Sequence, residues 1–234
     1  MRILIAGGHG KIARILTREL VAGGHEVTGL IRNDEQGADL MLDGATPVVL
    51  DIETATTAEV TAALTGFDVA VFAAGAGGGS GDARKQTVDF GGSVKLADAA
   101  EAAGVRRFIQ ISSTGNDLVR DGGLPVGLDE GMLAYFQAKL AAEDDLKPRD
   151  LDWTIVRPGG LTDADGTGLV QLQLSGPDHT VPGSVEKQGT VPRADVAAVL
   201  AELIRTGSGV RQTLHLLEGY LDVEDAIAAL PAAK

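Results

Sequence analysis

Short β-branched runs alternate with alanine-rich helical stretches along most of this chain, and this alternation constrains the possible folds more than any other feature. Nearly continuous apolar strands, each followed by a helix, must be covered on both faces. The pattern therefore predicts an α/β fold with a doubly wound parallel sheet, the Rossmann fold, whose ligands lie outside the carboxyl ends of the strands. The expected strands are residues 2–6, 26–31, 47–50, 68–74, 106–112 and 152–157, and the expected helices are residues 11–23, 57–66, 87–104 and 131–146.

The regular alternation of strands and helices ends after Pro158. Residues 160–192 are rich in Gly, Asp, Thr and Pro, and we expect them to form a small C-terminal cap over the substrate. A helix over 193–207, a strand over 212–217 and a helix over 222–230 should follow, with Arg193 and Asp195 forming a local ion pair at the first helix start. No linker divides the sequence, so residues 1–234 are expected to form a single domain of this Rossmann type.

Composition excludes several classes of function. The sequence has no cysteine and only four scattered histidines, which disfavours disulfides and any metal site. A formal net charge of −13 argues against nucleic-acid or anionic-membrane partners, which need basic surface. No apolar run is long enough to span a bilayer, and the N-terminus lacks the layout of a signal peptide. We therefore expect a cytoplasmic protein with a small-molecule ligand; its oligomeric state stays open.

A glycine turn follows the first expected strand and opens the first helix. In "IAGGHGKIA", Gly7 permits a tight turn, Gly10 lets backbone N–H groups approach a pyrophosphate, and Ala13 lets the helix pack closely on the strand. His9, Lys11 and Ile12 are assigned to the same nucleotide site. The alternative is a purely structural turn of an α/β protein.

The end of the second strand bears on the choice between NADP and NAD. Here the first residues past the strand are Arg32 and Asn33, whereas an NAD-selective site usually places an acid there for the ribose 2′-hydroxyl. A guanidinium can grip a 2′-phosphate with paired hydrogen bonds, so the sequence favours NADP. The alternative is that Arg32 is solvated and Asp34 or Glu35 binds the ribose.

Two further strand ends complete the expected cofactor site. Asp51 and Ile52 follow the third strand and are placed to meet the adenine ring. Small residues after the fourth strand, Ala73, Ala74 and Gly75, would let the ribose and phosphates pass close to the backbone.

Taken in order, these pieces resemble the atypical short-chain dehydrogenase/reductases with an NAD(P)-binding, NmrA-like or epimerase-like domain. The resemblance covers almost the whole sequence. It implies the strand order 3-2-1-4-5-6 with a seventh strand and a nicotinamide cofactor across the switch point of the sheet. The motifs that carry it are "AGGHGKIA", "VLDIE", "AAGVRRFIQISS", "YFQAKLAAED", "LDWTIVRPGGL" and "VPRADVAAVL".

The same resemblance implies a catalytic set of Ser, Tyr and Lys. The Tyr falls at Tyr135 and the Lys at Lys139, and the Ser matches Ser113 best, with Ser112 as its competitor. In this superfamily the phenol exchanges a proton with the substrate oxygen, the Lys lowers the pKa of the phenol, and the Ser orients the oxygen. Residues four apart share a helix face, so Tyr135 and Lys139 can point at one ligand. Alternatively, they are an interfacial ring and a solvated amine.

The ends of the fifth and sixth strands are expected to meet the nicotinamide half of the cofactor. Ile111 and Ser112 end the fifth strand, Pro158, Gly159 and Gly160 follow the sixth, and Lys139 would hold the ribose. For the "RPGG" segment a rigid strand exit would explain the same residues.

The leading hypothesis is an NADP-dependent oxidoreductase acting on a small carbonyl-, enone- or quinone-like substrate. The expected cap is short and poor in Lys and Arg, and the segment 114–131 that should rim the pocket is acidic, with Arg120 as its one cation. These features weigh against a sugar-nucleotide epimerase or dehydratase, which must bind a second diphosphate. The second hypothesis is a non-catalytic redox sensor, because some members of the family bind NADP without known turnover.

Overall fold

A nine-stranded sheet forms the centre of the molecule. The computed structural model describes residues 1–77, 79–122, 130–175 and 189–232. The strands lie in the order β11-β8-β10-β6-β5-β4-β1-β2-β3, and all neighbouring pairs are parallel except those made by β8. The predicted order 3-2-1-4-5-6 with a seventh strand, here β10, is confirmed. The strands are β1 (Arg2–Ala6), β2 (Glu26–Ile31), β3 (Thr46–Val49), β4 (Val69–Phe72), β5 (Arg107–Ile111), β6 (Asp152–Pro158), β8 (Leu169–Leu174), β10 (Gln212–Glu218) and β11 (Leu221–Asp222).

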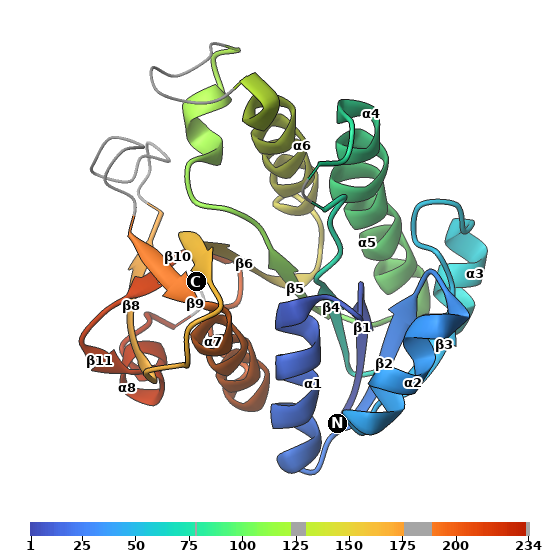
Figure 1. Cartoon of the computed structure of the whole chain (residues 1–234), viewed down its shortest axis with the longest axis horizontal. Coiled ribbons are helices and arrows are strands. Elements are labelled where there is room, and N and C mark those ends of the chain that lie inside the picture. The colour runs from blue at the N-terminus through green and yellow to red at the C-terminus, as the bar shows by residue number, and fades with distance from the viewer. Residues whose placement is uncertain (78, 123–129, 176–188, 233–234) are drawn as a thin grey trace.

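Helices cover both faces of this sheet (Figure 1). One face carries α1 (Lys11–Ala22), α2 (Gly37–Leu42), α7 (Arg193–Thr206) and α8 (Val223–Ala228), with α1 and α7 packed side by side. The other face carries α3 (Thr57–Leu64), α5 (Gly91–Ala103) and α6 (Glu130–Leu146). This layering confirms the Rossmann-type α/β fold. None of the described helices is both long and apolar enough to cross a membrane.

Side chains of β1 show how the sequence builds this arrangement. Ile3 and Ile5 join the apolar cluster beneath α1 and α7, whereas Leu4 and Ala6 join the cluster beneath α3 and α5. Successive residues of a strand point to opposite faces, so an unbroken apolar run fills both cores at once. Each fully buried Ile or Leu side chain of this kind contributes about 1.5–3 kcal/mol.

Short elements between strands were not expected from the sequence. Residues after β2 form the 3₁₀ turn η1 (Asp34–Gln36) and then α2, and a second 3₁₀ turn, η3 (Asn116–Val119), follows β5. After β4 the short helix α4 (Asp82–Arg84) leads into a π-helical turn, η2 (Lys85–Phe90). These elements are shorter than the span over which a hydrophobic period can be read.

Residues 160–192 divide between two sheets. The "VQLQL" run forms β8 and pairs with β10 in the main sheet, whereas β7 (Gly160–Thr162) and β9 (Thr190–Pro192) form a separate two-stranded sheet. Residues 176–188 of the expected cap, and 123–129 of the expected pocket rim, lie outside the described residues.

The expected ion pair between Arg193 and Asp195 is wrong. Arg193 Nη1 instead lies 2.6 Å from Asp163 Oδ1, and the buried Asp195 accepts the backbone N–H groups of Thr167 and Gly168. Both side chains therefore tie the segment after β7 to the start of α7. Asp195 is buried and Arg193 is not, so the two side chains find separate partners in the segment after β7 instead of pairing with each other.

Candidate functional site

A cavity of about 250 Å³ opens at the carboxyl ends of the parallel strands β1 to β4. Its walls come from four consecutive strand ends and from the segment that follows β4. The lining residues are Gly7, His9, Gly10, Leu30, Ile31, Arg32, Gln36, Leu50, Asp51, Ile52, Ala73, Ala74, Gly75, Ala76, Gly77, Arg84 and Val88. The cavity is thus where the fold class predicts a ligand.

The glycine turn forms the floor of this cavity. Gly7 has φ of +80°, and a Cβ atom there would lie 2.6 Å from Ala74 Cα, so neither the conformation nor the space tolerates a side chain. Gly10 precedes α1 as its N-cap without a capping side chain, and Ala13 is buried behind it. The first N–H groups of a helix have no partners within the helix, and its N-terminus favours negative charge. A dinucleotide diphosphate fits this turn.

Charged side chains gather at the end of the cavity near β2 and β3. Arg32 is exposed at the cavity edge, and among the described residues it has no ion pair. Across the cavity, Arg84 Nε donates to Glu53 Oε2 at 3.0 Å, and Thr87 donates to Glu53 Oε1 at 2.6 Å. The Thr87 hydroxyl and the two arginines hold the pKa of Glu53 below its usual range. This end can therefore take an anionic group on Arg32.

Half of the predicted cofactor residues line the cavity. They are Gly7, His9, Gly10, Arg32, Asp51, Ile52, Ala73, Ala74 and Gly75. His9 also bonds to Asp39 through Nε2, at 2.7 Å. The residues that do not line it are Lys11, Ile12, Asn33, Ile111, Ser112, Lys139, Pro158, Gly159 and Gly160.

Lys11 and Gly159, which lie outside the cavity, contact other parts of the protein. Lys11 Nζ lies 2.6 Å from Asp163 Oδ2, the carboxylate that also pairs with Arg193. At Gly159 a Cβ atom would lie 2.3 Å from the carbonyl oxygen of Gly189 and 2.5 Å from Leu217 Cδ2. Close packing against β10 and the chain before β9 therefore explains the glycine at position 159.

Tyr135 and Lys139 lie together on α6, beside the end of β5. Lys139 Nζ is 5.8 Å from the centroid of the Tyr135 ring and donates to the carbonyl of Ile111 at 3.2 Å. Tyr135 is half-buried and packs on Phe136, with ring centroids 5.5 Å apart. The sequence prediction that the two side chains share one face is therefore confirmed in geometry.

Lys139 has a partner that the sequence did not reveal. Asp89, on the π-helical turn η2, places Oδ1 3.1 Å from Lys139 Nζ and accepts the N–H of Ala76 with Oδ2 at 3.0 Å. Lys139 is 5% exposed and Asp89 1% exposed. Burial alone would lower the pKa of Lys139, but Tyr135, Asp89 and Glu143 raise it, so the amine stays charged.

The two candidate serines have different surroundings. Ser112 is buried and donates its hydroxyl to Glu143 Oε1 at 2.6 Å, while it accepts from Asn116 Nδ2 at 2.9 Å. Ser113 is half-buried, and its hydroxyl makes one long bond, of 3.2 Å, to the carbonyl of Thr114. Ser113 therefore keeps a hydroxyl that a substrate could engage, whereas the hydroxyl of Ser112 is committed to the protein.

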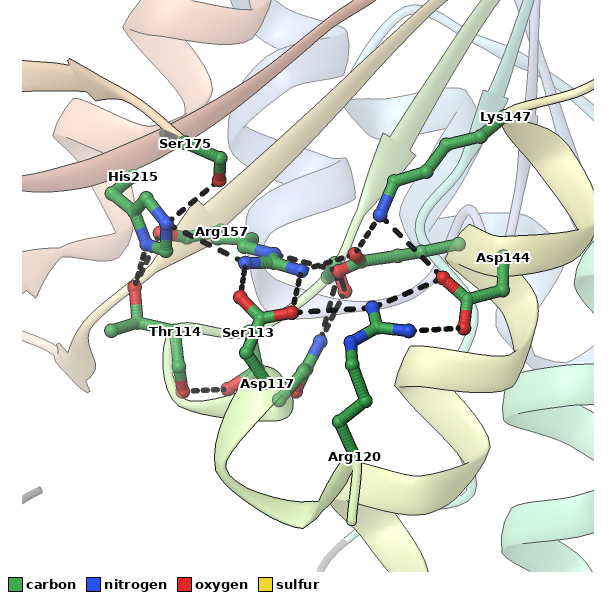
Figure 2. Close-up of polar contacts among 12 residues, drawn as sticks. Ser113, Thr114, Asp117, Arg120, Asp144, Lys147, Arg157, Ser175 and His215 are labelled. Atoms are coloured by element: carbon green, nitrogen blue, oxygen red, sulfur yellow. Dashed lines mark hydrogen bonds and ion pairs between the residues drawn. The ribbon is translucent and has the colours of Figure 1, made fainter. Parts of the chain in front are cut away.

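A buried charge cluster is centred on Arg157 (Figure 2), and Glu143 belongs to it. Arg157, on β6, is fully buried and donates Nε to Glu143 Oε1 at 2.9 Å, and its guanidinium also bonds to both carboxylate oxygens of Asp117. Burial alone would raise the pKa of Glu143, but Arg157 and Lys147 hold it low. Arg120 closes the outer side of the cluster through Asp117 and Asp144.

His215, on β10, meets the other side of Arg157. Its Nδ1 lies 3.3 Å from Thr114 Oγ1, and its Nε2 lies 3.0 Å from Ser175 Oγ and 3.5 Å from Arg157 Nη1. The Thr114 hydroxyl donates its proton to the carbonyl of Arg157 and can therefore only accept from His215. Nδ1 of His215 is thus the protonated nitrogen. Burial, with Arg157 alongside, lowers the pKa of His215 to about 4. The imidazole is therefore neutral at physiological pH.

Sequence reasoning missed Arg84, Val88 and Asp89. All three lie on α4 and η2, where a π-helical turn breaks the helical period that was used to assign faces. A single acid within the small, apolar stretch "TVDFGG" was the one signal for Asp89. It does not point to Lys139, which lies 50 residues later in the chain.

Comparisons with known proteins agree with this geometry. The family described as NAD(P)H-binding matches residues 7–206. A UPF0659 protein of Saccharomyces cerevisiae is 32% identical over 98% of this chain and 99% of its own length. A Bacillus halodurans structure assigned to the NAD-dependent epimerase/dehydratases is 35% identical, with a TM-score of 0.85 over 98% of this chain and 100% of that one.

A third relative carries a named activity of its own. The anaerobilin reductase ChuY of Escherichia coli O157:H7 is 27% identical, with a TM-score of 0.72 over 94% of this chain and 98% of that one. The family match spans most of the sequence, and the Bacillus halodurans structure shares the fold over 98% of this chain. The chain belongs to the NAD(P)H-binding family, in agreement with its resemblance to the atypical short-chain dehydrogenase/reductases.

Proposed function

We propose that this protein is an NADP-dependent reductase of a small carbonyl-, enone- or quinone-like substrate. The observation that carries the proposal is the position of Lys139 and Tyr135 at the end of β5. Lys139 reaches the Ile111 carbonyl there, Tyr135 lies beside Lys139, and Ser113 follows two residues after Ile111. A reductase of similar sequence, ChuY, supports the reaction class.

Each of these side chains has a role in the proposed reaction. When bound, NADPH supplies a hydride to the substrate carbon. The phenol of Tyr135 gives its proton to the substrate oxygen, Ser113 donates a hydrogen bond to that oxygen, and the charge of Lys139 stabilises the phenolate that remains. Water then returns a proton to Tyr135. Arg32 supports NADP as the cofactor, because its exposed guanidinium can take the 2′-phosphate.

Replacing Tyr135 tests the mechanism. In Tyr135→Phe the proton donor is lost, and we expect kcat to fall by about 100- to 10,000-fold with NADPH binding retained. The assay follows NADPH absorbance over a panel of quinones, enones and carbonyl compounds. Tyr220→Phe is the matched control, because Tyr220 is the other tyrosine and is 92% exposed. Equal turnover by Tyr135→Phe and the wild type would rule out this mechanism.

A non-catalytic NADP(H) sensor is the second candidate. It is favoured by the packing of Tyr135 in an apolar cluster with Phe136, Leu140 and Val119. A sensor would bind NADPH tightly and transfer no hydride to any member of the panel. A sugar epimerase would instead be purified with tightly held NAD, and both Arg32 at the cavity edge and the short cap expected from the sequence weigh against it.

A further inference from the structure

Arg84 and Arg32 both line the cofactor cavity, but the protein holds their guanidinium groups differently. Arg32 is exposed at the cavity edge and has no ion pair among the described residues. The side chain of Arg84 is 32% exposed and makes two bonds, from Nε to Glu53 Oε2 at 3.0 Å and from Nη1 to the carbonyl of Ala76 at 3.2 Å. One wall of the cavity therefore carries a free arginine and the other a fixed one.

Glu53, which holds Arg84, is itself fixed by three further contacts. Its Oε1 accepts the hydroxyl of Thr87 at 2.6 Å, and its backbone N–H donates to Asp51 Oδ1 at 3.0 Å. Lys95 Nζ donates to the carbonyl oxygen of Glu53 at 3.1 Å. The fold therefore sets the position of the Glu53 carboxylate, and with it the position of Arg84.

The two bonds of Arg84 also fix the orientation of its guanidinium plane. The N–H groups of a guanidinium lie in the plane of the group, so bonds from two of its nitrogens to two separate partners keep the plane from turning. Both of these N–H groups are directed at the protein, which leaves the flat face of the group for other contacts. Because Arg84 lines the cavity, a planar ring can stack on that face.

An adenine ring binds well against a flat surface, and the cavity offers few of them. No Phe, Tyr or Trp is among the described residues that line it, and the ring of His9 belongs to the glycine turn, where the fold class places the diphosphate. The side chains of Ile52 and Val88 supply aliphatic contact beyond β3. The guanidinium of Arg84 adds a rigid plane with positive charge, which attracts the electron-rich face of the ring.

We propose that Arg84 is a cofactor-binding residue on which the adenine ring of NADP stacks, and that Glu53 is the positioning residue that holds it there. The inference rests on the cofactor site of the proposed function but not on its hydride transfer. The two arginines then have different targets, because Arg32 meets the 2′-phosphate and Arg84 meets the ring that NADP and NAD share. Arg32 therefore selects between the cofactors, whereas Arg84 strengthens the binding of both.

Adenine nucleotides that lack the nicotinamide test this assignment directly. Isothermal titration calorimetry gives the affinities of AMP, which has no 2′-phosphate, and of 2′,5′-ADP, which has one. In Arg84→Ala both affinities should fall by the same factor, about 5- to 30-fold, because both ligands carry the ring. In Arg32→Ala only the affinity of 2′,5′-ADP should fall. A loss confined to 2′,5′-ADP in Arg84→Ala, no loss, or a wild type that binds neither nucleotide would overturn the proposal.

Two conservative variants separate the plane of Arg84 from its charge and test the role of Glu53. Arg84→Lys keeps the charge but replaces the flat group by a compact ammonium, so its affinity for AMP should stay close to that of Arg84→Ala. Full affinity in Arg84→Lys would show that charge alone binds the ligand and would contradict stacking. Glu53→Gln should weaken AMP binding in the wild type but not in Arg84→Ala, because Glu53 acts through Arg84. An equal loss in both backgrounds would reject that role for Glu53.

Two controls guard against a purely structural effect. Thr87→Val also removes a bond to Glu53 but leaves the guanidinium in place, and it should bind AMP as the wild type does. A loss as large as that of Arg84→Ala would mean that a loosened segment, and not a missing plane, weakens binding. Arg106→Ala removes an arginine that pairs with carboxylates at the amino end of β5, and it should leave both affinities unchanged. If Arg84→Ala does not fold, Arg84→Lys carries the same test.

These results separate the inference from the function beneath it. Binding of AMP that depends on Arg84, in a protein that reduces no member of the substrate panel, would uphold the stacking role and reject the reductase. Turnover that is lost in Tyr135→Phe, with AMP binding unchanged in Arg84→Ala, would do the reverse.

Discussion

The cofactor cavity and the charge cluster around Arg157 lie on the same sheet, yet they treat polar groups in opposite ways. At the cavity, Arg32 is exposed and the glycine turn leaves helix N–H groups open to a ligand. In the cluster, Arg157 and Glu143 are fully buried and bond to each other. The polar groups of the cavity are thus available to a ligand, whereas those of the cluster bond to one another and stabilise the fold. The neighbouring serines mark the border, with Ser112 in the cluster and Ser113 outside it.

Breaking the cluster should have the largest effect. Glu143→Ala removes one of the two carboxylates that pair with the buried Arg157 and leaves it with Asp117, and we expect the free energy of unfolding to fall by about 3–5 kcal/mol, measured by urea denaturation. Asp144→Ala, one position along α6, removes a partly exposed pair with Arg120 and should cost less than about 1 kcal/mol. Similar losses in the two variants would mean that burial does not distinguish these pairs.

Removing the cavity's exposed cation should have a smaller and more selective effect. Arg32→Ala should weaken NADPH binding by about 10- to 100-fold, equivalent to the loss of charged hydrogen bonds, and leave NADH binding nearly unchanged. Stability should not change, because Arg32 has no ion pair among the described residues. Fluorescence titration with both cofactors measures the ratio, and an equal loss for both would place Arg32 outside the 2′-phosphate site. Arg205→Ala, on the exposed end of α7, is the control.

The smallest effect concerns pH. The pKa of His215 lies at about 4 in the folded protein, below the usual value of about 6.5. Between these values the unfolded chain binds the extra proton, so the stability contributed by neutral His215 is present above pH 6.5 and is lost as the pH falls towards 4. From pH 6 to 4.5 the wild type should lose about 1–2 kcal/mol more than His215→Gln. Parallel pH profiles of the two proteins would show that the imidazole is not buried neutral.

The same contrast explains what the sequence could predict. The strand limits and the glycine turn depend on local patterns, such as the apolar run of β1 or the positive φ at Gly7, whereas the sheet order was implied by the family resemblance. Nine of the predicted cofactor residues line the cavity for that reason. The pairing of Tyr135 with Lys139 is equally local, because a helix brings residues four apart together.

The features that could not be predicted from the sequence depend on contacts between distant parts of the chain. Arg157 bonds to Asp117 across 40 residues, and Asp89 reaches Lys139 only because η2 lies against α6. Buried polar contacts leave no period in the sequence, so neither the hydrogen bond of Ser112 to Glu143 nor the ion pair of Lys139 with Asp89 could be predicted from it. The pairing of Arg193 with Asp163 rather than Asp195 has the same origin.

Gly159 has a consequence for any systematic survey of substitutions in this protein. Its missing side chain makes room for the Gly189 carbonyl and Leu217, and a Cβ atom would be excluded there as firmly as at Gly7. A map of tolerated substitutions would mark both positions alike. Cellular abundance measured beside cofactor retention would separate them, since alanine at position 159 should deplete the protein whereas alanine at position 7 should also empty its nucleotide site.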